Sequence, residues 1–463
     1  MMPSWLKKER SEKNSSKARS SFPGFGIPHP YQIFPFPIEG LLLFLKKKIL
    51  FWVMINFSAL NSQISAPKTH SQVALVYDCD HEIVLFSKKG EQKIHPASTT
   101  KIATLLYSLH CNRDPKELVV VLPELLRSIS KEQKIAGNYT VLPYLLEPDA
   151  YTIGLVPHSY YSLEDLYHAL TLVSANDAAN VLAYHLGEQS IEQFMIGLNR
   201  FLTSLGCTET TYVNPSGLEY PEHRTTALDL AKMLSYGIKQ PDFLKIIGTV
   251  FYKMETGDLI DRELNNSNRL LRSENGLQYK YCLGGKTGYT EHAGYCFVGA
   301  AQNKERTVVV AAMQSATPLE RFIDATNLFN AAFAEKKTTR VFYNALDPCF
   351  SVQPMYAKHT LPLYLLEDLK VESFASIVNA IEVKVEYFEA KLPIKKGEIL
   401  GQVQLIVPSG KILDTKVLVA SRDAPHTWVS FWVEKWFKAL FFVILLVSVG
   451  IIFKRTTRQE IGA

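Results

Sequence analysis

The stretch that decides the fold runs from residue 95 to residue 104 and reads His95-Pro-Ala-Ser-Thr-Thr-Lys-Ile-Ala-Thr104. At its centre is a Ser-x-x-Lys string, Ser98-Thr-Thr-Lys101, followed by apolar residues at helical spacing. A helix that begins at Ser98 places Lys101 one turn further on, so its amine can lie beside the serine hydroxyl. A serine hydroxyl is a poor nucleophile at neutral pH and needs such an adjacent base. The string therefore predicts a nucleophilic serine activated by lysine instead of histidine.

Two further strings follow in the order that a serine acyltransferase of this kind requires, Ser174-Ala-Asn176 and Lys286-Thr-Gly288. The Ser-x-x-Lys and Ser-x-Asn strings are not specific alone, because each occurs a second time in the chain. The second Ser-x-x-Lys ends at Lys131 and the second Ser-x-Asn ends at Asn275. Each string by itself also fits a helix cap, a turn or a hairpin end. The order of all three and the helical run after the first select the set that begins at Ser98.

The predicted roles follow from the groups that these residues carry. To act as a base, Lys101 must be neutral, which requires burial or a second cation such as Lys286 to lower its pKa. The backbone N–H groups of Ser98 and Tyr289 are candidates for an oxyanion hole.

The second wall of the site is expected to come from Ser174 and Asn176. The Ser174 hydroxyl can pass a proton to a leaving amine, and the Asn176 amide can hold a substrate carbonyl or orient the lysine base. The third string supplies a cation and a hydroxyl, Lys286 and Thr287, on an expected edge strand where Gly288 leaves room. This arrangement suits a substrate with a free carboxylate lying antiparallel to the strand.

The length of 463 residues suggests two or three domains, and the net charge of +5 is concentrated at the two ends. Residues 1–48 hold nine Lys or Arg against three Glu, and residues 454–463 add +2, which leaves about −3 for the remainder. The globular part is therefore not a nucleic-acid binder by charge. Six scattered cysteines show no zinc spacing, so we predict no metal and no cofactor; whether any of them pair after export stays open.

Both ends are typical of segments that handle membranes. Residues 46–66 have the basic, apolar and small-residue parts of a secretory signal peptide, with an uncleaved anchor as the alternative. Residues 1–45 are expected to be disordered or to precede the true start. The apolar run 439–453, with tryptophans before it and Lys454-Arg455 after it, predicts a transmembrane helix over 431–454 and a cytoplasmic tail over 455–463. An in-plane amphipathic helix over 429–438 is the alternative.

Between these ends the pattern predicts two domains. Over 67–335, apolar runs of strand length near both ends enclose helical patterns, which indicates an α+β domain with one antiparallel sheet flanked by helices. Over 336–425, short β-like runs with Pro and Gly turns indicate a small all-β domain without a catalytic constellation.

Longer strings around these motifs resemble the low-molecular-mass penicillin-binding proteins, specifically the serine-type D-alanyl-D-alanine carboxypeptidases. The strings are His95 to Thr104, Ser174-Ala-Asn-Asp-Ala-Ala-Asn180, Asn214-Pro-Ser-Gly-Leu218, Asn265 to Leu271, Gly285 to Phe297 and Leu392 to Gly401. The resemblance implies a β-lactamase/transpeptidase-like catalytic domain, with Ser98, Lys101, Ser174 and Asn176 as catalytic positions and Lys286 as a substrate anchor.

The resemblance also implies partners and a location. The partners are peptidoglycan stem peptides ending in D-Ala-D-Ala, β-lactam antibiotics that acylate Ser98, and a membrane contacted by the C-terminal helix. The implied location is the inner membrane, with the catalytic domain on its periplasmic or outer face.

Three features around the expected cleft depart from the usual family pattern. The stretch 112–160 is longer than usual, Cys282-Leu-Gly-Gly285 precedes Lys-Thr-Gly where Asp-Gly is common, and Asn266-Ser267 stands where a basic residue is frequent. They bear on substrate preference and deacylation rate and leave the class of reaction unchanged. A transmembrane helix is also expected where many relatives have an amphipathic anchor.

Two other functions compete. The competing functions are a peptidoglycan endopeptidase, which uses the same motifs, and a non-catalytic penicillin-binding sensor or scaffold. A β-lactamase is disfavoured because the chain has no Glu-x-x-Leu-Asn string.

Overall fold

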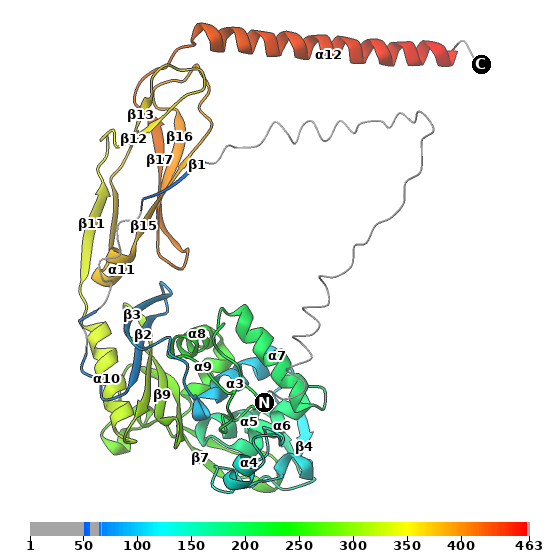
Figure 1. Ribbon diagram of the computed structural model, residues 1–463, viewed down its shortest axis with the longest axis vertical. Coiled ribbons are helices and arrows are strands. Elements are labelled where there is room, and N and C mark those ends of the chain that lie inside the picture. The colour runs from blue at the N-terminus through cyan, green and yellow to red at the C-terminus, as the bar shows by residue number, and fades with distance from the viewer. Residues whose placement is uncertain (1–50, 56–63, 66, 461–463) are drawn as a thin grey trace. The chain divides into compact units, whose positions relative to one another are not determined.

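The computed structural model describes residues 51–55, 64–65 and 67–460 (Figure 1). The segment 1–45 and most of the signal peptide expected over 46–66 lie outside the described residues. The described chain divides into two compact units, the first ending at Lys336 and the second beginning at Lys337 and including the short strand 51–55.

The first unit is built on a five-stranded antiparallel sheet whose strands come from both ends of the unit. The strand order is β3-β2-β10-β9-β8, so β8 is an edge strand. The strands are β2 (Val73–Asp78), β3 (Ile83–Lys88), β8 (Cys282–Thr290), β9 (Gly294–Gln302) and β10 (Thr307–Ser315). The register pairs Lys286 with Val298 on β9, which leaves the other edge of β8 unpaired with any strand of this sheet.

Helices cover both faces of this sheet (Figure 1). The helix α10 (Glu320–Phe333) packs on one face, and α8 (Ala227–Gly237) packs on the other. The α+β class predicted for this unit is confirmed.

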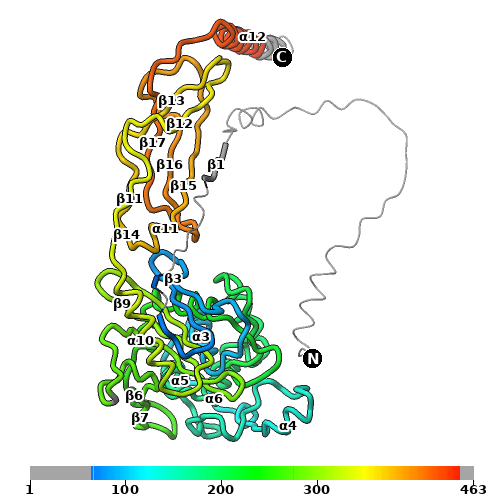
Figure 2. Tube along the Cα trace, turned by 60° about the vertical axis from the view of Figure 1, so that its left-hand side comes forward, coloured from blue at the N-terminus to red at the C-terminus, as the bar shows by residue number. Residues whose placement is uncertain are grey.

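The helix α3 (Lys101–His110) lies at the centre of the helical part, in contact with all the neighbouring helices (Figure 2). These neighbours are α5 (Leu163–Leu172), α6 (Asn176–Leu186), α7 (Ile191–Ser204), α8 and α9 (Pro241–Gly248). Residues 101 to 106 of α3 are all buried, because helices surround its first turns. The only charged side chain among them is Lys101, which is 0% exposed.

The long stretch 112–160 folds against α6. It contains β4 (Leu118–Val120), which pairs with β5 (Tyr160–Ser162), and the short helix α4 (Lys131–Ala136). Two side chains of α6 hold it: the Asp177 carboxylate accepts from the backbone N–H groups of residues 153–155, and the Asn180 amide donates to two carbonyl groups. These bonds fix the stretch as one wall beside the first turn of α6.

The second unit contains a six-stranded antiparallel sheet in the order β1-β15-β16-β17-β13-β12. These strands are β1 (Phe51–Ile55), β12 (Phe350–Val352), β13 (Leu361–Leu365), β15 (Glu382–Tyr387), β16 (Ile399–Ile406) and β17 (Ile412–Ala420). A separate pair joins β11 (Lys337–Tyr343) to β14 (Leu369–Phe374), and α11 (Ala375–Ala380) adds one helix to the mainly β unit. The strand β1 falls within residues 46–66, the range expected to be a signal peptide. The signal peptide itself stays a prediction.

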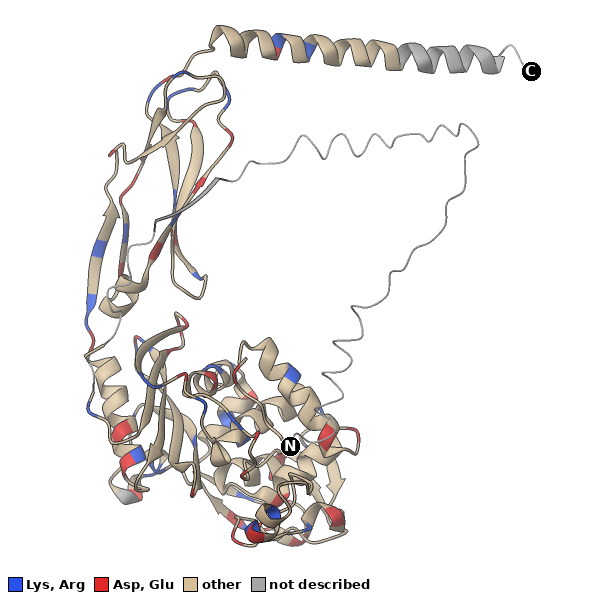
Figure 3. Cartoon of the chain, viewed as in Figure 1, with Lys and Arg blue, Asp and Glu red and all other residues tan. Residues whose placement is uncertain are grey.

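The transmembrane helix expected over 431–454 is not supported. A single helix, α12 (Trp428–Glu460), covers this range, but within the described part of the chain no helix is long and apolar enough to cross a membrane. Three charged residues, Glu434, Lys435 and Lys438, form a charged band near its start (Figure 3). The uncharged run that follows them is 439–453.

Candidate active site

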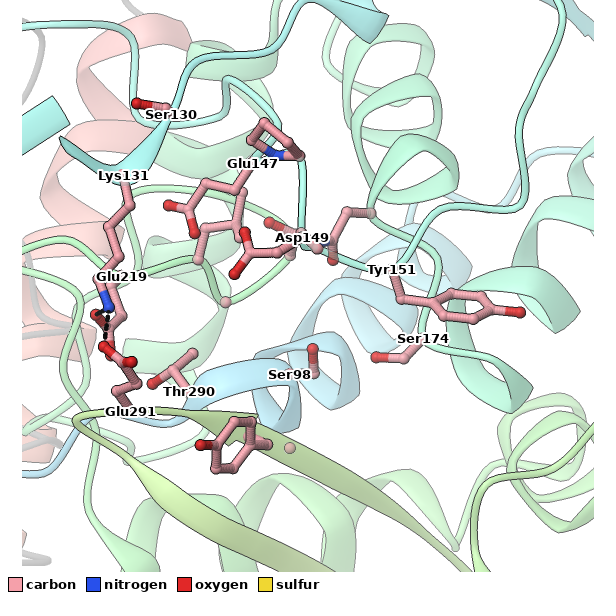
Figure 4. Close-up of a pocket in the computed structure, with 18 of the residues that line it drawn as sticks. Ser98, Ser130, Lys131, Glu147, Asp149, Tyr151, Ser174, Glu219, Thr290 and Glu291 are labelled. Carbon is pink, nitrogen blue, oxygen red and sulfur yellow. Dashed lines mark hydrogen bonds and ion pairs between the residues drawn. The ribbon is translucent and has the colours of Figure 1, made fainter. Parts of the chain in front are cut away.

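The sequence-predicted residues meet in one cleft of the first unit, which has a volume of about 890 Å³ (Figure 4). Its lining comes from the turn before α3 that holds Ser98, the turn before α6, the loop Asn214–Leu218, the end of β8 and the wall 130–151. Ser98, Ser174, Asn176, Thr287, Gly288 and Tyr289 all line the cleft. Lys101 and Lys286 lie buried at its base, 0% and 1% exposed.

Ser98 lies in a short 3-10 helix, η1 (Ala97–Thr100), that leads directly into α3. The helix expected to begin at Ser98 therefore begins with this tighter turn, and the α-helix proper starts at Lys101. The residue before the serine, Ala97, has a φ of 49°, a left-handed conformation that a residue with a Cβ rarely adopts. Strain of this kind collects where the surrounding structure dictates the backbone, as it does at functional sites.

The Lys101 amine has three oxygen neighbours and all of them are uncharged. Its Nζ lies 3.0 Å from Ser98 Oγ, 2.6 Å from Asn176 Oδ1 and 2.6 Å from the Ser216 carbonyl oxygen. Burial without a carboxylate partner disfavours the ammonium form, and the nearby cation of Lys286 disfavours it further. The pKa of Lys101 is therefore well below its usual range, with desolvation as the largest cause.

The loop Asn214–Leu218 supplies the Ser216 carbonyl and packs over the nucleophile turn. The Asn214 Oδ1 accepts from the backbone N–H groups of Ser216, Gly217 and Leu218, which closes the loop. Gly217 has a φ of 90°, and a Cβ on it would lie 2.0 Å from the carbonyl oxygen of Ala97. Only glycine fits there, for reasons of both conformation and space.

The second string places its two polar side chains differently. Asn176 is the first residue of α6 and its amide oxygen accepts from Lys101, so in this structure it orients the lysine. Ser174 has a φ of 67°, and its Oγ is buried with no hydrogen-bond partner among the described residues. Its side chain lies near that of Ser98 in the cleft (Figure 4). Because this hydroxyl has no partner, it is available to donate a hydrogen bond to a bound ligand or to accept one from it.

The third string lies along the free edge of β8. A Cβ on Gly288 would lie 3.0 Å from the Ser98 nitrogen, so the absence of a side chain lets this strand approach the nucleophile turn. Burial, and after it the cation of Arg321, lower the pKa of Lys286 to about 7. The Lys286 Nζ donates to the Thr287 carbonyl at 3.1 Å. Tyr289 is exposed at the rim and stacks on Tyr295.

Arg321 lines the cleft and was missed by sequence reasoning. It projects from the first turn of α10, and its Nη1 donates to the carbonyl groups of Gly288 and Cys296 at 3.0 and 3.3 Å. Its buried Nε has no partner among the described residues. Nothing near Arg321 in the sequence signals this position, because a helix that closes over the sheet brings it to the end of β8.

The discarded Ser-x-x-Lys string also reaches this cleft. Lys131 lines it from α4 and forms ion pairs with Glu291 at 2.5 Å and Glu219 at 3.7 Å (Figure 4). Ser130 caps α4 by accepting from the Gln133 N–H. The serine of the string itself, Ser128, is exposed, and its lysine is charged and paired, unlike Lys101. The other discarded string lies in η5 (Ser273–Asn275), which does not line the cleft.

Metal and disulfide chemistry find no support within the described residues. There, no group of three or more His, Cys, Asp or Glu side chains is arranged to hold a metal ion. All six cysteines are unpaired.

Comparison with known proteins places the chain among cell-wall peptidases. The family profile described as D-alanyl-D-alanine carboxypeptidase matches residues 61–317. The D-alanyl-D-alanine carboxypeptidase DacF of Bacillus subtilis is 25% identical over 76% of this chain and 85% of its own length. A D-alanyl-D-alanine endopeptidase of Escherichia coli is 26% identical over 57% of this chain and 77% of its own length.

Among solved structures, penicillin binding protein 5 of Haemophilus influenzae has a similar fold. It matches with a TM-score of 0.55 at 21% identity, over 78% of this chain and all of that chain. This likeness supports the expected penicillin-binding-protein fold.

We predict that Gly217→Ala destabilises the first unit far more than Gly154→Ala. Both glycines have positive φ, but a Cβ on Gly154 meets nothing within 4 Å. In the Gly154 variant the free energy of unfolding should fall by about 1–2 kcal/mol, the cost of the left-handed conformation alone. In the Gly217 variant it should fall by roughly 1–3 kcal/mol more, because the backbone must also shift. Thermal unfolding by circular dichroism measures both, and equal losses would contradict the packing argument.

Proposed function

The chain belongs to the D-alanyl-D-alanine carboxypeptidase family, and we propose that it removes the terminal D-alanine of peptidoglycan stem peptides through an acyl-enzyme on Ser98. The observation that carries this proposal is the environment of Lys101. A neutral amine has two N–H donors and one lone pair. Two acceptors at 2.6 Å take the donors, and the remaining position faces the Ser98 hydroxyl at 3.0 Å.

In the acylation step the lone pair of Lys101 takes the hydroxyl proton while Ser98 Oγ bonds to the carbonyl carbon of the penultimate D-alanine. The carbonyl oxygen becomes an oxyanion between the N–H groups of Ser98 and Tyr289. The proton then passes to the leaving nitrogen, with the Ser174 hydroxyl as the relay, and the C–N bond breaks. D-Alanine departs, and water hydrolyses the remaining ester to release the shortened peptide and regenerate Ser98.

The terminal carboxylate of the substrate is expected to bind at the Lys286 end of β8. Two cationic side chains, Lys286 and Arg321, meet the strand there, and the Thr287 hydroxyl faces the Ser267 hydroxyl at 2.9 Å. A carboxylate satisfies both cations and takes part in the charge-assisted hydrogen bonds that such groups form. Recognition of a free carboxylate favours the carboxypeptidase over the endopeptidase, which cleaves a cross-link with a larger leaving group.

A non-catalytic binding role is less consistent with the site. Burying a lysine without a counter-charge costs several kcal/mol, and a scaffold gains nothing from it. β-Lactams, which combine an acylating carbonyl with a carboxylate, fit the same two ends of the cleft. We place the catalytic unit on the outer face of the membrane, where peptidoglycan lies. Support comes from the basic and apolar pattern of residues 46–66.

We predict that Ser98→Ala abolishes both D-alanine release from a peptide ending in D-Ala-D-Ala and labelling by fluorescent penicillin. Removing the nucleophile leaves no acyl-enzyme to form. The matched control is Ser128→Ala, which alters the exposed serine of the discarded string and should keep both activities. Penicillin labelling that survives in the Ser98 variant would overturn the assignment of Ser98 as the nucleophile. Absence of D-alanine release from the wild type would overturn the proposed carboxypeptidase activity.

Lys101 and the two cations should affect different steps. Lys101→Ala is expected to abolish acylation, because the base is lost. Lys286→Ala and Arg321→Met are expected to reduce the preference for a free-acid peptide over its C-terminal amide by roughly tenfold to hundredfold each, since each removes one charge-assisted bond. The ratio of kcat/KM for the acid and the amide measures this preference. An unchanged ratio in both cation variants would show that the carboxylate binds elsewhere.

The pH profile of kcat/KM for a free-acid peptide should fall as pH rises through about 7, the pKa of Lys286. Only the protonated form of this group attracts a carboxylate, and kcat/KM reports the pKa values of the free enzyme. Replacement by a guanidinium in Lys286→Arg should move the alkaline fall upward, because arginine stays charged. A fall at the same pH in this variant would assign the alkaline limb to another group.

A further inference from the structure

A buried histidine lies behind the nucleophile turn on the side away from the cleft. His223 is 1% exposed, and its Nε2 lies 2.8 Å from the hydroxyl of Thr100, a residue of η1 that is itself fully buried. The ring stacks on Tyr212 with centroids 4.7 Å apart. The catalytic steps proposed above do not use either side chain.

The hydrogen bonds of His223 define a chain with one direction. The backbone N–H of Val213 donates to Nδ1 at 3.1 Å, so in the neutral ring the proton lies on Nε2. That N–H donates to Thr100 Oγ1, and the Thr100 hydroxyl donates to the carbonyl oxygen of Ala97 at 2.9 Å. Burial holds the pKa of His223 well below its usual range, which agrees with the neutral ring.

The chain ends on a peptide unit that matters for the chemistry. The carbonyl of Ala97 and the N–H of Ser98 belong to the same planar peptide, in which the C=O and the N–H point in opposite directions. Holding the carbonyl toward Thr100 therefore sets the direction of the Ser98 N–H. Ala97 has an unfavourable φ of 49°, a conformation that persists only where contacts such as this one hold the local backbone.

We propose that His223 is a positioning residue that acts through Thr100 and the Ala97 carbonyl to keep the Ser98 N–H aimed at the oxyanion of the reaction. The proposal rests on the acyl-enzyme proposed for Ser98. It assigns to His223 no contact with substrate and no proton transfer. Its effect belongs to the step in which the oxyanion forms, since an oxyanion donor works only when it already points at the developing charge.

The position of His223 in the chain links this anchor to the lysine base. Val213 and His223 flank the loop Asn214–Leu218, whose Ser216 carbonyl accepts from Lys101 and whose Gly217 packs on the Ala97 carbonyl. The segment 213–223 thus contacts both the base and the peptide of the oxyanion donor. A change at His223 that leaves the loop in place should disturb the donor and spare the base.

The experiment compares acylation by a fluorescent penicillin in full-length variants, separating the acylation rate constant at saturation from the half-saturating concentration. Asparagine can keep the bond to the Val213 N–H but is too short to reach Thr100, whereas glutamine can reach it. His223→Asn should lower the rate constant by roughly tenfold to hundredfold, a fraction of the full loss of one oxyanion donor, with unchanged half-saturation. His223→Gln should recover part of the rate.

Thr100→Val removes the hydroxyl with little change in shape and provides a second route to the same bond. It should slow acylation about as much as His223→Asn, and the double variant should be little slower than either, because both break one chain. The control is His168→Asn, which alters another buried histidine, one that bonds to the Glu164 carbonyl and stacks on Tyr252. It should lower thermal stability without slowing acylation.

The outcomes separate this proposal from the function on which it rests. A wild-type protein that penicillin does not label would overturn the acyl-enzyme itself. Normal labelling of the wild type with an unchanged acylation rate in His223→Asn and Thr100→Val would overturn only the positioning role. Additive losses of acylation rate in the double variant would also overturn the proposal. So would a His168→Asn variant that slows acylation as much as His223→Asn and unfolds at the same temperature as that variant, because His223 would then be only a stabilising residue.

Discussion

The site depends on one constraint, the burial of the Lys101 amine among oxygens that carry no charge. A neutral amine placed this way has its two N–H groups satisfied by Asn176 and Ser216 and its lone pair left for Ser98. Each partner comes from a different element, so the first turn of α6, the loop Asn214–Leu218 and η1 must all be in place before the lysine is a base. The helices packed around α3 provide that rigidity, because a lysine whose surroundings admitted water would recover its charge.

Lys286 is buried like Lys101, but its pKa is lowered less because its neighbours differ. Its pKa of about 7 leaves it near the balance between charged and neutral, with Arg321 as the opposing cation. An incoming carboxylate favours the charged form of Lys286. That charge in turn disfavours the ammonium of Lys101, whose pKa already responds to Lys286. A bound carboxylate adds a negative charge beside that cation, so the two largely cancel at Lys101, and desolvation remains the main cause of its low pKa.

Sequence reasoning predicted the features that depend on local spacing and failed where the fold brings distant parts together. The helical spacing of Ser98 and Lys101 and the edge strand expected at Lys286 are local features. The structure places Lys101 beside Ser98 and Lys286 on the edge strand β8. Arg321 could not be found this way, because α10 carries it to β8 only through packing on the sheet. The transmembrane helix expected over 431–454 finds no support among the described residues.

The backbone itself carries part of the chemistry, and a side-chain motif cannot express it. Ala97 and Ser174 both have left-handed conformations, at φ of 49° and 67°, and both adjoin or form the cleft. Such conformations persist only where packing over-determines them. At Ala97 the determinants are the Thr100 hydroxyl on its carbonyl and Gly217 against it, two contacts from segments more than 100 residues apart. The reactive serine is therefore set by tertiary contacts to its backbone. A Ser-x-x-Lys string without them, such as the one ending at Lys131, has only an exposed serine and a lysine held in an ion pair.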